Sequence, residues 1–75
     1  MAWTQKQLAD VIERNEEWLL SQNGIVGVGV GLDADGNVCV EVLTDDVPSD
    51  VRRSVERRLE GVPVVFTNTG TIEAL

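Results

Sequence analysis

Hydrophobic and polar positions follow two different periods along the chain, and the change of period marks the elements. In Trp3–Gln22 the apolar residues recur every three or four positions, which predicts an amphipathic helix. Thr4 followed by Gln7 is a capping-box pattern at its start, and Asn23-Gly24 supplies its end. Asn15 lies near the middle of the apolar face, where a buried amide needs a hydrogen-bond partner.

A period of two follows the helix. Ile25–Leu32 alternates aliphatic residues with glycine, and Val38–Leu43 continues the alternation after the turn Asp33–Asn37. This pattern predicts a β-hairpin whose first strand is the centre of the domain. We expect the helices to contact the valines of its aliphatic face. That face comprises Val26, Val28, Val30, Leu32, Val38, Val40 and Val42.

The last third of the chain predicts a second helix and a third strand. Ser49–Glu60 carries a thin apolar stripe, and Ser49 is the expected N-cap. Val62–Phe66 is the expected third strand. Since Pro63 cannot donate a ladder hydrogen bond, this strand is predicted to lie at a sheet edge. Thr71–Leu75 is a candidate for a short final strand.

The element order is therefore α-β-β-α-β, with a terminal β if the last segment pairs. This order predicts a single α+β domain over residues 1–75. We expect a small two-layer sandwich, with both helices on one face of a three- or four-stranded mixed sheet. A chain of 75 residues buries only about 60% of the surface that its unfolded form exposes. Its stability therefore depends on efficient packing, or on an oligomer or partner that covers more apolar surface.

Charge and composition exclude several classes of function. The net charge of -7 opposes binding to nucleic acid or to an anionic membrane. There is no histidine to act as a general base, and the single cysteine cannot form an intramolecular disulfide. The N-terminus lacks an apolar signal core, and no apolar run reaches membrane-spanning length. We expect a cytoplasmic protein with no cofactor.

The glycine-rich face of the hairpin is the main candidate for an interface. Glycine weakens a strand, so several on one face indicate that another group approaches the backbone closely. A nucleotide-binding loop is excluded, because these glycines lie inside a strand rather than before a helix. The face is either a contact with a partner or second copy, or an ordinary solvated surface. Its candidate residues are Gly27, Gly29, Gly31, Cys39, Glu41 and Leu43.

Two charged segments offer alternatives. Asp33, Asp35 and Asn37 resemble part of a calcium loop, but the spacing fits no EF-hand, and hairpin-turn chemistry also explains them. Arg53 and Arg57 lie on the predicted solvent side of the second helix. They are either a docking site for an acidic partner or part of a solvated face.

Three segments carry a family resemblance. They are the glycine-valine repeat of Gly24–Leu32, the run Leu59–Val65 with its Gly-Val-Pro-Val sequence, and the closing Thr69–Leu75. Together they resemble the small N-terminal segment that precedes the protease domain in bacterial trypsin-like serine peptidases. The resemblance covers residues 24–75 and implies an accessory or pro-region-like module. It carries over no catalytic residue, because these 75 residues contain no protease domain.

The sequence therefore predicts a non-enzymatic interaction module. It would associate with itself or with a larger protein, through the glycine-lined sheet face or an exposed strand edge. The alternative is a small domain that binds a cation or ligand at the acidic hairpin turn. An enzyme is not expected, because no pair of carboxylates has a spacing suited to acid-base catalysis.

Overall fold

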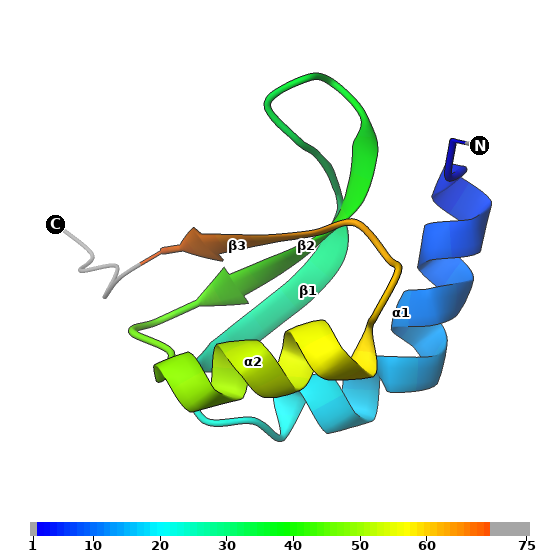
Figure 1. The fold of residues 1–75 in the computed structure, drawn as a ribbon. Coiled ribbons are helices and arrows are strands. Elements are labelled where there is room, and N and C mark those ends of the chain that lie inside the picture. Colours follow the sequence, from blue (N-terminus) through cyan, green and yellow to red (C-terminus); the bar gives the residue numbers. More distant parts are fainter. Residues whose placement is uncertain (1, 70–75) are drawn as a thin grey trace, which may run out of the picture.

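The computed structural model describes residues 2–69, and these form two helices and three strands (Figure 1). Their order, α-β-β-α-β, confirms the predicted α+β fold. The candidate final strand at Thr71–Leu75 lies outside the described residues. The elements are α1 (Gln5–Leu20), β1 (Ile25–Leu32), β2 (Val38–Thr44), α2 (Ser49–Arg58) and β3 (Val64–Asn68).

The three strands form one mixed sheet in the order β1-β2-β3. β1 and β2 are antiparallel, with Val28 opposite Val42, whereas β2 and β3 are parallel, with Glu41 opposite Val65. β1 is therefore an edge strand, and the prediction that it is the centre of the domain is wrong. The central strand is β2, because its connection through α2 leads to β3 on its other side.

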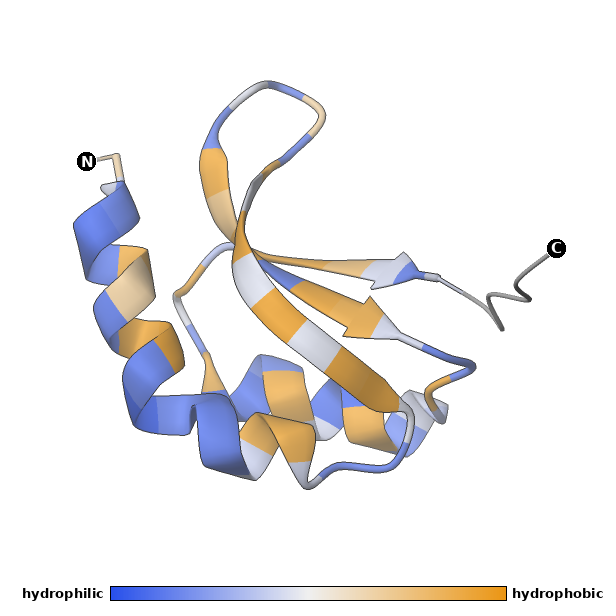
Figure 2. Ribbon diagram, turned by 180° about the vertical axis from the view of Figure 1, so that it is seen from behind, coloured by the Kyte–Doolittle hydropathy of each residue, from blue (hydrophilic) through white to orange (hydrophobic). Residues whose placement is uncertain are grey.

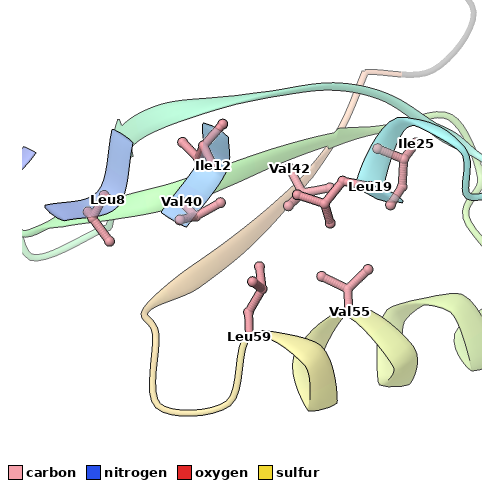
Figure 3. Packing of buried hydrophobic residues seen from close by; sticks show 8 residues of the cluster. All are labelled: Leu8, Ile12, Leu19, Ile25, Val40, Val42, Val55 and Leu59. Carbon is pink, nitrogen blue, oxygen red and sulfur yellow. The ribbon is translucent and has the colours of Figure 1, made fainter. Parts of the chain in front are cut away.

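The core lies between the sheet and the two helices, which cover the same face of the sheet (Figures 1 and 3). Figure 3 shows Val55 of α2 and Leu59, the residue after this helix, pointing toward the sheet. The predicted two-layer arrangement is thus confirmed. The buried members of this cluster are Leu8, Ile12, Leu19, Ile25, Val40, Val42, Val55 and Leu59.

A β-bulge changes which residue at the start of β1 reaches the core. Ile25 lies opposite Thr44, but the register shifts before Gly27, which lies opposite Leu43. As a result Ile25 is buried, with 6% of its surface exposed, while Val26 is 58% exposed. The expectation that Val26 contacts the helices is wrong, because the extra residue of a bulge takes the neighbouring side chains out of simple alternation.

The far end of β1 is also less covered than expected. Val30 is 38% exposed and Leu32 is 63% exposed. Ala2 and Trp3, which precede α1, line a depression together with Pro63 and with Val38, Asp33 and Asn37 at the turn end of the hairpin. The exposed fraction of Leu32 shows that neither this segment nor α1 covers the outer end of β1.

Local capping patterns were predicted for both helices, with different results. Thr4 caps α1 as expected: the Gln7 N–H donates to Thr4 Oγ1 at 3.1 Å, and the Thr4 N–H donates to Gln7 Oε1 at 2.9 Å. In α2, however, Ser49 is the first helical residue and Pro48 is the N-cap. The proline ring holds φ at -63°, and the Pro48 carbonyl accepts the N–H of Val51 at 3.1 Å. The helix needs no side-chain cap there.

Candidate protein-interaction surface

Within residues 2–69, one face of the sheet has no helix on it, because both helices lie on the other. Glycines alternate with aliphatic residues along β1, as the pale and orange bands of that strand in Figure 2 show. The register places the glycines beside side chains of β2 and β3 that point the same way. This uncovered face comprises Gly27, Gly29, Gly31, Cys39, Glu41, Leu43, Val65 and Thr67.

Two of the three glycines leave room for neighbouring side chains of the same sheet. A Cβ atom on Gly27 would lie 3.2 Å from Leu43 Cδ1, and one on Gly31 would lie 3.1 Å from Glu41 Cβ. The Glu41 carboxylate is held in place by Thr67, whose hydroxyl donates to Glu41 Oε2 at 3.2 Å. The close approach that the glycines predict is therefore made in part by Leu43 and Glu41 of this chain.

Gly29 differs from its two neighbours. A Cβ atom there would meet no heavy atom within 4 Å. Gly29 is thus the only glycine of β1 whose missing side chain leaves open space, at the middle of the strand. A larger residue at this position fits the single chain, and a partner on this face would meet it.

Cys39 lies on the uncovered face but not at its surface, because only 1% of it is exposed. Burial raises the pKa of the Cys39 thiol, and the nearby carboxylates of Asp33 and Glu41 raise it further. The thiol is therefore protonated at neutral pH and is a poor nucleophile. Its position fits a small residue that fills space, and it is not an accessible contact residue.

The free edge of β1 is the second part of the candidate surface. Across the hairpin turn the Asp33 N–H donates to the Asn37 carbonyl at 2.9 Å. Hydrogen-bonded residues alternate along an antiparallel ladder, so the glycines of β1 direct their backbone groups toward β2. The residues between them direct their N–H and C=O groups to the open side of the strand. These residues are Val28, Val30 and Leu32.

Exposed aliphatic side chains gather on this edge strand. Of the four large hydrophobic residues that are exposed in residues 2–69, three belong to β1 and the fourth is Leu20. The three are Val26, Val30 and Leu32. β1 has eight residues and contains no charged residue and no proline. An uncharged edge strand with unpaired backbone groups is suited to pairing with another strand.

The four arginines of α2 are all exposed, but two of them contact aromatic rings of neighbouring elements. Arg53 and Arg57 are exposed, as expected. Arg52 lies over the Phe66 ring, with its guanidinium carbon 4.9 Å from the ring centroid, and Arg58 lies 4.4 Å from the Trp18 ring. These two contacts are of the cation–π type and anchor α2 to the neighbouring elements.

Asn15 joins the two helices. Its Nδ2 donates to the Val11 carbonyl at 2.7 Å, and its Oδ1 accepts from Arg58 Nε at 2.9 Å. The amide predicted to need a partner on the apolar face therefore has two. Within the described residues no buried side-chain nitrogen or oxygen lacks a hydrogen-bond partner, so none of them indicates a missing ligand.

The acidic turn uses its first carboxylate to hold its own backbone. Asp33 Oδ1 accepts from the N–H groups of Asp35 and Asn37, both at 2.9 Å. No group of three or more His, Cys, Asp or Glu side chains in residues 2–69 is placed to hold a metal ion. The hydrogen bonds explain Asp33 through turn structure, and no observation favours a cation there.

Comparison with known proteins identifies no relative: no protein-family model, no curated protein and no solved structure matches this chain. The resemblance of residues 24–75 to a segment of bacterial peptidases thus stays a prediction. Neither α1 nor α2 is long and apolar enough to cross a membrane.

The residues that sequence reasoning missed are the exposed ones on β1. Val26, Val30 and Leu32 belong to the aliphatic pattern that predicted burial, and alternation alone cannot tell an edge strand from a central one. The one feature of the sequence that could have indicated their exposed position was the absence of any charged residue along the strand.

Proposed function

We propose that this chain is a non-enzymatic interaction module that binds another polypeptide by strand addition at the free edge of β1. The observation that carries the proposal is the concentration of exposed aliphatic side chains on an uncharged edge strand. Outward-facing backbone N–H and C=O groups supply affinity in this binding mode, and alternate side chains supply specificity. The uncovered glycine face lies beside the edge and can receive side chains of the incoming segment.

Two variants separate the edge from the face. Val30→Pro removes an N–H that points away from β2, so it blocks the edge and leaves the ladder within the sheet intact. Gly29→Val fills the open space on the glycine face without meeting another atom of the chain. Circular dichroism and thermal unfolding first establish that both variants are folded.

The test is capture of binding proteins from the host by immobilised wild type and by the two variants. We expect a protein bound by the wild type to be kept by Gly29→Val and lost by Val30→Pro. The opposite pattern would move the binding surface to the glycine face. If both variants kept every bound protein, neither part of this surface would be the binding site.

A further inference from the structure

We propose that the β1 edge binds a second copy of this chain, with the two β1 strands antiparallel about a twofold axis at Gly29. This inference rests on the proposed function, since it needs β1 as the binding edge. Pairing would join the two three-stranded sheets into one continuous sheet. Both helical layers would then lie on the same side of it, because a twofold axis perpendicular to a sheet does not exchange its faces.

The backbone of β1 fits this register. An axis at Gly29 places Val28 of one copy opposite Val30 of the other. Both residues direct N–H and C=O groups to the free edge, so they can exchange two hydrogen bonds. Gly29 then lies opposite Gly29 in a non-hydrogen-bonded pair, where the two Cα atoms approach to about 4.5 Å.

The side chains of the edge complement themselves in the same register. Val30, 38% exposed in the single chain, gains Val28 of the second copy as a neighbour. Leu32, the most exposed of the large hydrophobic residues, comes beside the start of β1 in the second copy. One twofold arrangement therefore adds neighbours to two of the exposed aliphatic residues on β1, Val30 and Leu32.

The charges at the two ends of β1 decide the direction of pairing. A partner selected by the net charge of -7 would be basic, but β1 carries no acidic residue with which to select it. Antiparallel pairing puts the acidic turn, Asp33 to Asp35, beside Asn23 to Ile25 of the second copy, which are uncharged. Parallel pairing would put the two acidic turns side by side, where like charges repel.

The pairing of one short strand is a small interface. A stable complex commonly buries at least about 1,200 Å², and two eight-residue strands offer less contact than a whole domain face. The dimer is therefore weak and forms as the concentration rises. Added salt strengthens it, because screening reduces the repulsion between two acidic copies. Binding of a basic partner would respond to salt in the opposite direction.

The first experiment is sedimentation equilibrium of the intact chain from about 5 to about 500 µM, a range suited to weak association. We expect a monomer–dimer equilibrium that shifts to dimer in high salt, and at least a tenfold weaker dimer for Val30→Pro. Val64→Pro is the matched control, because it removes an outward N–H on β3, at the other edge of the sheet. It should leave the dimer unchanged.

A second experiment tests the register. In a Cys39→Ala background, Gly29→Cys places two thiols opposite each other at the axis, at a Cα separation that a disulfide can span. Mild oxidation should give a covalent dimer. Val65→Cys, on the same uncovered face but on β3, should not.

The outcomes are distinct. If the wild type stays monomeric, the proposal that β1 binds a second copy is wrong. If Val30→Pro nevertheless loses a captured host protein, strand addition at β1 is still supported. A dimer that persists in Val30→Pro, or that cross-links through Val65→Cys, overturns pairing at β1. A dimer lost only in Val30→Pro and cross-linked through Gly29→Cys supports it.

Discussion

The two edges of the sheet differ in length, in chemistry and in the cover that the rest of the chain gives them. The β1 edge has eight uncharged residues and three exposed aliphatic side chains. The β3 edge has five residues, starts directly after Pro63 and lies beside α2, with Arg52 over the Phe66 ring. Proteins protect strand edges with short strands, prolines and charged side chains. β3 is short, follows a proline and has the charged side chains of α2 beside it, whereas β1 has none of these features.

The two edges of the sheet therefore present different groups to an approaching strand. An open groove of about 500 Å³ runs between α2 and β3, and its charged side chains are Arg52, Glu56 and Glu60. A strand approaching β3 meets these charges beside apolar lining residues such as Val64 and Phe66, whereas β1 presents no charged side chain. The same small sheet thus has one guarded edge and one edge suited to pairing.

The largest loss of stability should come from a change at the residue just before β1. Gly24 has φ +89°, and a Cβ atom there would lie 2.7 Å from the Val47 Cα. We expect Gly24→Ala to lower the free energy of unfolding by about 3 kcal/mol, through backbone strain plus displacement of the neighbouring segment. Urea unfolding measures the loss.

Gly36→Ala is the control for that change. Gly36 has a similar φ of +82° but nothing within 4 Å of its Cβ position. Its loss should be only about 1 kcal/mol, from the backbone conformation alone. Equal losses in the two variants would show that the contact of Gly24 with Val47 contributes nothing.

A smaller loss of stability should follow removal of the Arg52 side chain, which lies beside β3. Arg52→Ala removes the guanidinium from the Phe66 ring and the stem that lies along it, so we expect a loss of about 0.5–1 kcal/mol. Arg53→Ala, on the exposed side of the same helix, should cost close to nothing. Chemical denaturation of the two variants measures the difference. An equal loss in the free energy of unfolding would show that the contact of Arg52 with Phe66 does not stabilise the fold.

The smallest effect concerns Cys39 on β2, between the two edges, and is confined to alkaline pH. The pKa of its thiol is raised in the folded state, mainly by burial. Above the ordinary thiol pKa of about 8.5 the unfolded chain loses a proton that the folded chain keeps, so stability falls as pH rises. Unfolding of the wild type from about pH 7 to about pH 10 should show a steeper fall than Cys39→Ala. Parallel profiles would contradict this.

Local patterns predicted the parts of the fold that depend on near neighbours in the chain. The capping box of Thr4 and Gln7 and the hairpin turn held by Asp33 formed as expected. Each depends on hydrogen bonds or backbone angles within about five residues, which the sequence states directly. Gly24 has a positive φ, but it does not end α1, whose C-cap is Ser21. The N-cap of α2 was misplaced by one residue, because Pro48 performs the role without a side-chain bond.

The candidate surface could be predicted only in part. Alternation identified the glycine face correctly, but the sequence did not indicate that Leu43 and Glu41 would cover two of its three glycines. The register from the turn to Gly27 is regular, so the cover depends on how the side chains of Leu43 and Glu41 lie across the neighbouring strand, which alternation does not specify.

By itself, the sequence determined the elements, their order and the face that each amphipathic segment turns to the core, since these follow from residue periodicity and turn chemistry. Only the tertiary structure decided that β2 is central, that β1 is an edge and that the outer end of β1 is exposed. The physical reason is that a hydrophobic pattern records which side chains avoid water. It does not record which neighbouring strand or helix excludes the water from them.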